Sequence, residues 1–402
     1  MAFIGITRFS LYQPDSGAWK SSRNGTSFDR SKYLSTLYAK ERIEPRLKIF
    51  LEYSLPLISQ ATIKHNIKHI VRYSTEMPET YQQKIQEAAE IYPFLILDRH
   101  TNGQGSVNPY KVGYDAAKDS STFAFYRLDD DDLLSTDFFD QTAKYVSPHF
   151  AGMRVSLAQG ITALFDGQHF SEFRSSYHPM IAIGLLDIYG LSPDGSMIRP
   201  PDAPHNKSDR YGSVIVNAEK PSYFWTRHVG QDTSYQSENA MDDVLKALDK
   251  FPSLAPNINV GDLFPTIRNN IKPRKLLKVA SEENIPLSGR KFELSTPVEG
   301  SFELHISSTF ATNTGALSAL VYFDIEDQTG VVKKDNLEAL PGFSISSYQD
   351  IGYFSYLSTA PGNHSQALSF RLPHGYKLKQ LGIVPFGPNG FAFKMNQLNI
   401  LQ

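Results

Sequence analysis

The chain has 402 residues, of which 41% are hydrophobic, and a formal net charge of −2, so it can bury a large core and lacks the strongly basic surface of a nucleic-acid-binding protein. The absence of cysteine excludes disulfides, thiolate metal sites and a cysteine nucleophile, and it fits a cytoplasmic protein. The N-terminal sequence MAFIGITRFSLY lacks the features of a signal peptide, and no apolar run approaches the length of about 18 residues that spans a membrane.

Short apolar runs alternate with helical patterns through the first third of the chain. We expect a first strand over residues 3–12. A helical pattern over residues 33–59 follows, which Pro45 and Pro56 should divide. Strand and helix then alternate up to residue 128: we expect strands at 68–73, 94–97 and 122–128 and helices ending near 91 and 118. This order predicts an α/β fold with a mostly parallel sheet and crossover helices.

Four consecutive aspartates, Asp129 to Asp132, follow the third of these strands within YRLDDDDLLSTDFFD, and a helix is expected from about Ser135 to Tyr145. Two like charges at 4 Å cost about 1 kcal/mol in water and about 4 kcal/mol at an effective dielectric of 20. Solvation on a surface loop would relieve this repulsion, and so would a divalent cation. On extended backbone, Asp129 and Asp131 would point one way and Asp130 and Asp132 the other.

The pattern L-D-x-D-D-x-L-x-x-D-F-F resembles the D-x-D signature of GT-A glycosyltransferases, particularly the inverting type. The fuller R-L-D-D-D-D-x-L is similar to a bacterial family of rhamnosyltransferases, as is R-L-K-I-F-x-x-x-x-L-P-L-I-x-Q, which begins at Arg46. The resemblance implies a GT-A nucleotide-binding domain with a Mn²⁺ or Mg²⁺ ion bound by Asp131. It places Asp129 on the ribose side of the nucleotide and near the metal, with Asp132 in support.

Other site residues are also implied by this resemblance, and each has an ordinary alternative. Asp98 closes a strand where the family contacts the base, although a surface ion pair explains it equally well. Arg127, just before the aspartates, would touch phosphate or neutralise a carboxylate, and Arg8 is a further nucleotide contact. His228 lies in T-R-H-V-G-Q-D-T-S, similar to the family's H-x-x-N/D-x-S, and would meet the metal or the diphosphate unless it is a packing residue. Ser234 follows in a loop suited to phosphate.

An inverting transferase requires a carboxylate that deprotonates the acceptor hydroxyl. The family's topology places this base between the acceptor-side strand and the His228 strand. Asp209 is the first candidate and Asp202 the second, while Asp187 and Asp166 remain open.

The sequence after about residue 286 consists of alternating strands. Phe302, Leu304 and Ile306 alternate with polar residues, and a change of apolar parity predicts a bulge near Asn396. We therefore expect a transferase domain over residues 1–265, a linker over 266–285 and an antiparallel β-sandwich over 286–402. The sandwich would bind acceptor glycan or mediate homo-oligomerisation, and the resemblance ends before it.

These observations favour a metal-dependent glycosyltransferase. It would move a sugar, rhamnose by resemblance, from a nucleotide-diphosphate donor to a hydroxyl of a bacterial surface glycan or a lipid-linked oligosaccharide. It would be cytoplasmic or peripheral at the inner membrane. A carbohydrate-binding protein with structural Ca²⁺ at the aspartates is one alternative, and a metal-dependent phosphohydrolase is another.

Overall fold

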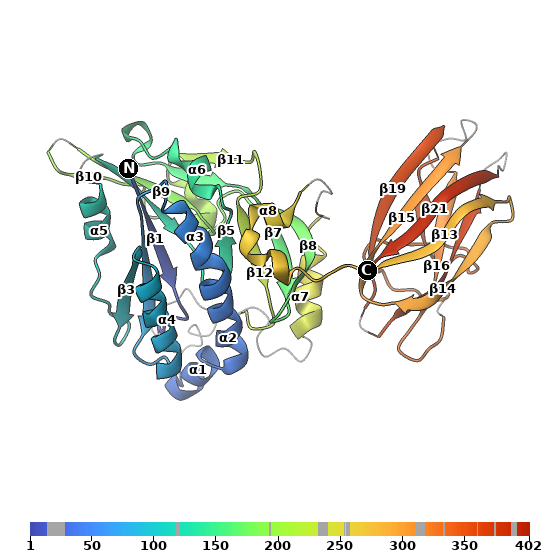
Figure 1. The fold of residues 1–402 in the computed structure, drawn as a ribbon, viewed down its shortest axis with the longest axis horizontal. Helices are drawn as coiled ribbons and strands as arrows, with labels where there is room; N and C mark the ends of the chain where they lie inside the picture. The colour runs from blue at the N-terminus through green and yellow to red at the C-terminus, as the bar shows by residue number, and fades with distance from the viewer. Residues whose placement is uncertain are drawn as a thin grey trace. The chain divides into compact units, whose positions relative to one another are not determined.

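The protein forms two compact units, Met1–Lys272 and Pro273–Gln402. The computed structural model describes residues 1–13, 29–117, 121–192, 194–231, 240–252, 254, 258–310, 318–332, 334–359, 361–373, 375–386 and 392–402. Figure 1 shows the first unit as a layered α/β body and the second as β-strands only.

The centre of the first unit is a mixed, mostly parallel sheet (Figure 1). Its strands in spatial order are β11 (Val214–Asn217), β6 (Arg154–Leu157), β9 (Leu186–Leu191), β4 (Thr122–Arg127), β1 (Ala2–Arg8), β2 (Ile67–Ser74) and β3 (Leu95–His100), and β10 (Met197–Ile198) pairs with β9. The four strands β4, β1, β2 and β3 are parallel neighbours, whereas β9 runs antiparallel between β4 and β6. This topology confirms the predicted fold class.

Side chains on alternate positions of the central strands bury both faces of the sheet. Phe3 packs into a core with α3 (Leu55–Ala61), α4 (Glu79–Ile91) and α6 (Phe138–Ala143), whereas Ile4 packs on the opposite face with α5 (Pro109–Ala116). The helical segments of the unit are α1 (Arg30–Leu37), α2 (Lys40–Lys48), the π-helix η2 (Ile49–Ser54), α3 (Leu55–Ala61), α4 (Glu79–Ile91), α5 (Pro109–Ala116), α6 (Phe138–Ala143), α7 (Ala240–Leu248) and α8 (Val260–Leu263), with 3₁₀ turns η3 (Pro148–Phe150), η4 (His205–Arg210) and η5 (Pro265–Asn270). No helix within the described ranges is both long and apolar enough to cross a bilayer.

The predicted break at the two prolines does not occur. Helical residues run continuously from Lys40 to Ala61, with Pro45 inside α2 and Pro56 in the first turn of α3. The π-helix between them changes the hydrogen-bond register there, and Pro56 lies where a missing backbone N–H costs little. The result is one rod that presents Arg42 and Arg46, one turn apart, on the same side.

A smaller sheet lies beside the central one. Its order is β5 (Asp132–Leu134), β12 (Tyr223–Arg227), β7 (Gln159–Phe165) and β8 (Phe170–Tyr177). The helix expected from Ser135 is correspondingly shorter and begins at Phe138, because the chain first forms β5 against β12. The strands of this sheet pack on the π-helix through Ile49 and Tyr53.

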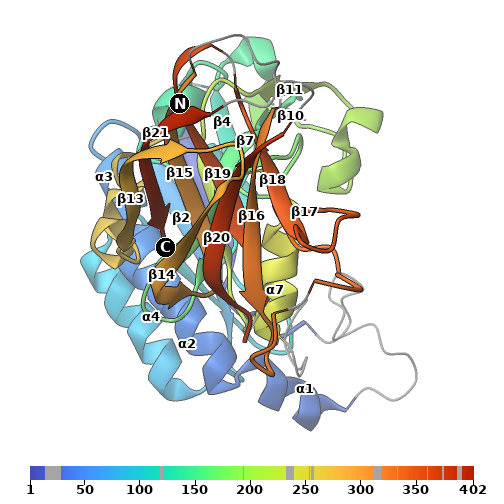
Figure 2. The same cartoon turned by 90° about the vertical axis from the view of Figure 1, so that its right-hand side faces the viewer.

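The second unit contains two antiparallel sheets with one shared core. The first has the order β13 (Leu276–Ile285), β21 (Phe393–Leu401), β15 (Ser301–Phe310) and β19 (Gly362–Arg371); the second has the order β14 (Arg290–Val298), β20 (Lys377–Pro385), β16 (Ala319–Glu326), β18 (Tyr353–Leu357) and β17 (Ser344–Ile345). Figure 2 shows β20, β16, β18 and β17 side by side. Phe302 from the first sheet and Phe323 from the second meet in the core.

Two local predictions for this unit can be compared with the structure. The alternation along β15 buries Phe302, Leu304 and Ile306, and the pairing of β21 with β15 skips Asn396, as the predicted bulge requires. The residues expected to form a linker, 266–285, instead include part of η5 and the whole of β13. β13 pairs with the end of the chain, so its strand character depends on a partner more than 100 positions away.

Candidate functional site

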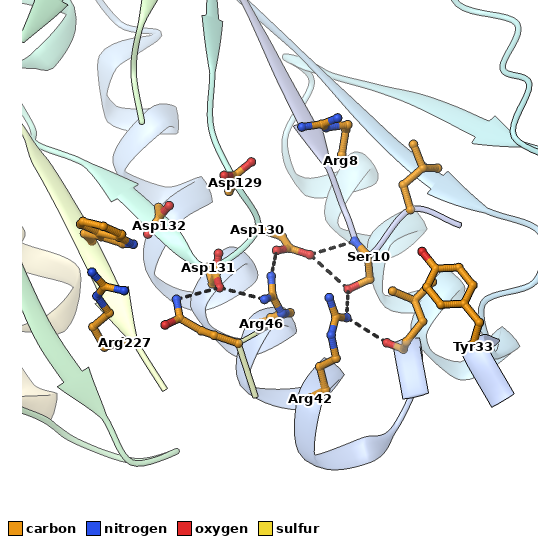
Figure 3. Close-up of a pocket in the computed structure, with 14 residues that line it drawn as sticks. Arg8, Ser10, Tyr33, Arg42, Arg46, Asp129, Asp130, Asp131, Asp132 and Arg227 are labelled. Carbon is orange, nitrogen blue, oxygen red and sulfur yellow. Dashed lines mark hydrogen bonds and ion pairs between the residues drawn. The ribbon is translucent and has the colours of Figure 1, made fainter. Parts of the chain in front are cut away.

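A cavity of about 200 Å³ opens at the carboxyl ends of β1 and β4 (Figure 3), the edge at which open α/β sheets bind ligands. Its lining consists of Arg8, Ser10, Leu11, Tyr33, Leu37, Arg42, Arg46, Asp129, Asp130, Asp131, Asp132, Trp225, Arg227 and Gln231. Four aspartates therefore face four arginines around one small space.

All four aspartates line this cavity, which corrects the expectation that they would alternate between two faces. The reason is local: the chain turns at Asp130 and Asp131, between the end of β4 and the start of β5, and is not extended there. Asp130 accepts hydrogen bonds from the backbone N–H of Ser10 at 2.8 Å and from its hydroxyl at 3.2 Å. Asp130 thus holds the chain after β1 in place, a role that strand periodicity did not predict.

Arg46 joins the two central aspartates. Its guanidinium pairs with Asp130 and lies 3.1 Å from Asp131 Oδ2, with all three side chains at most 8% exposed (Figure 3). Burial raises the pKa of the Asp131 carboxyl, but Arg46 and His228 outweigh this effect and hold that pKa well below its usual range. Asp131 is therefore a carboxylate, stabilised by donors from α2 and from the residue after β12.

The outer two aspartates have different surroundings. Asp129 receives two hydrogen bonds from the Arg127 guanidinium onto one oxygen, at 2.9 and 3.1 Å. Asp132 accepts one from the backbone N–H of Thr226 at 3.2 Å, and burial together with repulsion from Asp131 and Asp129 raises the pKa of its carboxyl well above the usual value. Negative charge at Asp132 is therefore the least compensated in the turn.

His228 is 1% exposed and contacts Asp131, with 3.2 Å between Nε2 and Oδ2. Its Nδ1 accepts the backbone N–H of Gly230 at 3.2 Å, so the proton of the neutral ring lies on Nε2 and points at the carboxylate. Burial lowers the pKa of His228, and Asp131 opposes that shift only in part. The structure thus brings together two of the three predicted metal ligands.

The donors around the turn bear on whether a divalent ion fits. Carboxylate and imidazole donors suit Mn²⁺, and a cation would oppose the burial and the repulsion that raise the pKa of Asp132. Within the described ranges, however, no three acidic or imidazole side chains are arranged as a metal site. As it stands, Asp129 is turned to Arg127, and Asp131 to Arg46 and His228. The residue types fit a metal ion. To bind one, Asp129 and Asp131 would have to give up their ion pairs with Arg127 and Arg46.

Arg227 is a cavity residue that sequence reasoning missed. Its guanidinium lies 3.5 Å from the centre of the Trp225 ring, and Arg227 and Trp225 share a side of β12 because they are two residues apart. Arg227 forms no hydrogen bond or ion pair with the described residues, its Nε is buried, and burial lowers the pKa of the guanidinium. A half-buried cation with no ion pair to the described residues, at the cavity wall, suits an anionic ligand. Its position directly before His228, a predicted site residue, is the feature of the sequence that could have identified Arg227.

Of the other residues predicted to contact the nucleotide, some line the cavity and some do not. Arg8 lines the cavity at the end of β1. Asp98 lies outside the lining and is 1% exposed. Its oxygens accept hydrogen bonds from the backbone N–H groups of Ser106 and Val107, at 2.9 and 3.1 Å, and contact His100. Asp98 thus holds the loop after β3. Ser234 falls outside the described residues.

The base candidates all lie outside the cavity lining. Asp209 is exposed on η4 and Asp202 is exposed beside Arg199, at 3.2 Å. Asp187 pairs with Arg154 at 2.6 Å, and Asp166 accepts two backbone N–H groups in the turn after β7. Of the four carboxylates, Asp209 is the one with no hydrogen bond or ion pair to the described residues.

Comparisons with solved structures give low overall similarity. S. aureus TarS residues 1–349 in complex with UDP-GlcNAc aligns at 15% identity and a TM-score of 0.28, covering 62% of this chain and 66% of that one. A structure of S. aureus TarS aligns at 11% identity and a TM-score of 0.25, covering 98% of this chain and 77% of that one. An inositol-1-phosphate CTP transferase from T. maritima aligns at 11% identity and a TM-score of 0.26, covering 63% of this chain and 98% of that one. The chain thus spans slightly less than two thirds of the first of these structures, and the fold assignment rests on strand order.

Family membership rests on the sequence. No curated protein matches the chain. The model of the family described as "Putative rhamnosyl transferase" matches residues 2–234, which include β1, the helical rod, the aspartate turn, β12 and His228. The matched range is more than half of the 402 residues. The chain therefore belongs to this family of glycosyltransferases.

Proposed function

We propose that the protein transfers a sugar from a nucleotide-diphosphate donor, bound in the cavity at the aspartate turn, to a hydroxyl group of a glycan acceptor. The observation that carries this proposal is the unpaired Arg227 guanidinium facing the same cavity as four aspartates. A diphosphate would supply the counter-charge for the Arg227 guanidinium, and the aspartates suit a cation and the ribose hydroxyls.

Each side chain of the cavity has a role in this proposal. Arg227, with Arg8, binds the diphosphate, and Trp225 keeps the Arg227 guanidinium flat against its ring. Asp129 accepts from the ribose. Asp131 and His228 would hold a Mn²⁺ or Mg²⁺ ion, which when bound offsets charge on the leaving diphosphate. Asp131 is already ionised for this purpose. For neutral His228 to offer Nε2 to the metal, the ring proton would have to move from Nε2 to Nδ1, in place of the hydrogen bond that Nδ1 accepts from Gly230.

The sugar and the acceptor are the finer part of the proposal. Rhamnose is the sugar that the family description favours, and a bacterial surface glycan or lipid-linked oligosaccharide is the acceptor class. Inversion at the anomeric carbon would require a base on the face opposite the diphosphate. A chain without cysteine fits a cytoplasmic site for this reaction.

Removal of the central carboxylate tests the proposal. The wild-type chain, given a panel of nucleotide sugars with Mn²⁺, should release nucleoside diphosphate from at least one donor. Asp131→Asn should lower that rate by about 100-fold or more, because loss of a supporting group alone costs about 10–100-fold at metal sites. Asp115→Asn, on the exposed face of α5, is the matched control and should leave the rate unchanged. Release of inorganic phosphate from simple esters instead would make the protein a phosphohydrolase.

Asp209 is proposed as the general base because its carboxylate is exposed and uncommitted. Asp209→Asn should lower kcat for transfer to acceptor by about 100-fold, within the range of about 10²–10⁴ for a positioned base, and leave donor affinity unchanged. The measurement is acceptor-dependent turnover beside nucleoside diphosphate binding. If transfer survives in Asp209→Asn and fails in Asp202→Asn, the second candidate is the base.

A further inference from the structure

A second cavity, of about 640 Å³, lies in the C-terminal unit. Its floor is the side of the five-stranded sheet turned away from the core: Val321 and Phe323 of β16 point into the core, so Tyr322 and Asp324 point out of it. Figure 2 shows β16 between β20 and β18, and the cavity lies over β14, β20 and β16. Its volume is within the range of about 300–1,000 Å³ of small-molecule sites.

The floor of this cavity contains an aromatic ring held against the sheet. Tyr322 pairs across the strands with Gly382 of β20, and a Cβ built at Gly382 would lie 2.1 Å from Tyr322 Cζ and 2.4 Å from its hydroxyl oxygen. The ring therefore occupies the space that any other residue at position 382 would fill. The ring lines the cavity and is 8% exposed, because the ends of the Lys291 and Lys334 side chains lie over it.

Polar groups surround this ring. Asp324 pairs with Lys334 and lies 3.9 Å from the Lys291 ammonium, and both ammonium groups are within 6 Å of the centre of the Tyr322 ring, at 5.8 Å for Lys291 and 5.5 Å for Lys334. Lys334 also donates to the Ile351 carbonyl at 3.3 Å, which fixes one wall. The Tyr322 hydroxyl forms no hydrogen bond with the described residues, and no hydrogen bond holds the Lys291 ammonium.

We propose that this cavity binds a sugar ring of a glycan. A pyranose presents apolar C–H groups on a face and hydroxyl groups around its edge. The Tyr322 ring matches the face, whereas its hydroxyl, the Lys291 ammonium and the Asp324 carboxylate match the edge with donors and acceptors. Two lysines and three aspartates line the cavity, which does not suit a polyanion such as nucleic acid.

The binding site itself stands on the geometry of the C-terminal unit. That the bound glycan is the acceptor of the transferase rests on the proposed function of the first unit. If so, a glycan held by one unit is present at raised effective concentration for the other, since one chain carries both. The acceptor would then be a polymer of several sugars.

Glycan binding by the full chain, measured without nucleotide donor, tests the inference. The wild-type chain is applied to an array of purified bacterial surface polysaccharides, and the best ligand is titrated by calorimetry. Tyr322→Ala should weaken binding by about tenfold or more. Lys291→Gln, at a side chain that is 58% exposed and whose loss does not endanger folding, should weaken it as well. Tyr114→Ala, at an exposed tyrosine of α5, is the matched control and should bind as wild type does.

The outcomes separate this inference from the proposed function. Asp131→Asn should bind the polysaccharide with wild-type affinity although its donor turnover is lost. Polysaccharide binding by a chain that turns over no donor would overturn the transferase and keep the sugar site. Binding that is unchanged in both Tyr322→Ala and Lys291→Gln, or no binding to any polysaccharide on the array, would overturn the sugar site. A change of oligomeric mass in Lys291→Gln would assign this surface to subunit contact.

Discussion

The contacts of Arg227 indicate a role in ligand binding and not in the stability of the fold. A charged side chain that serves only the fold has its counter-charge within the fold, whereas the Arg227 guanidinium is half-buried over Trp225 and has no ion pair to the described residues. Its burial carries a cost in the free chain, which lowers the pKa of the guanidinium. Such a cost is tolerated where a ligand completes the charge pair.

Arg227→Met should therefore weaken nucleoside diphosphate binding without lowering the melting temperature. Charge-assisted hydrogen bonds contribute about 1.5–3 kcal/mol, which corresponds to about a 10- to 150-fold rise in Kd. Calorimetric titration with the nucleoside diphosphate product measures Kd, and a thermal melt measures stability. Arg99→Met, an exposed arginine on β3, is the control for loss of charge. A variant that melts earlier but binds normally would make Arg227 a packing residue.

A buried series of hydrogen-bonded polar groups connects three parallel strands to the aspartate turn. The Tyr126 hydroxyl on β4 is 2.8 Å from His69 Nδ1 on β2, and His69 Nε2 is 2.9 Å from the Thr7 hydroxyl on β1. Thr7 then donates to the carbonyl of Leu128 at 2.7 Å, one residue before Asp129. The position of the turn therefore depends on strand packing below it.

His69 makes this arrangement sensitive to acid. Burial lowers the pKa of His69 to about 3, whereas the unfolded value is about 6.5. Between these values the unfolded chain binds one more proton, so the free energy of unfolding falls as pH falls, by about 1.4 kcal/mol per unit. Between pH 7 and 4.5 the wild type should lose about 2–3 kcal/mol more than His69→Gln, measured by urea denaturation. Parallel pH curves for the two proteins would contradict the assignment of a neutral buried His69.

The elements also show which features of the site are visible in sequence. Strand β4 was predicted from the apolar run over residues 122–128, and the aspartates follow that run directly in the chain. Strand β5 was not, because three residues carry no periodicity and its pairing with β12 is specified about 90 positions away. Arg46 was recognised as part of a family segment, but its contact with Asp130 depends on the direction of the helical rod, which two prolines obscured.

The chain divides at Lys272, with a separate hydrophobic core on each side. Residues 1–272 contain every residue of the cavity at the aspartate turn. Since an independent core is the requirement for independent folding, residues 1–272 alone should fold and bind nucleoside diphosphate with the Kd of the full chain. Titration of both chains makes the comparison. An insoluble or non-binding fragment would show that the first unit needs the second.

The contacts of the aspartate turn have a consequence for the order of folding. They connect residues 84 positions apart for Arg46 and Asp130, 97 for His228 and Asp131, and 120 for Ser10 and Asp130. Contacts at such separations close long loops and form slowly, whereas the backbone hydrogen bonds of the helical rod are local. The helices can thus appear before any of these three contacts exists. During refolding, the ability to bind nucleotide should therefore return after the far-ultraviolet signal of the helices, and a chain released early would be helical yet inactive.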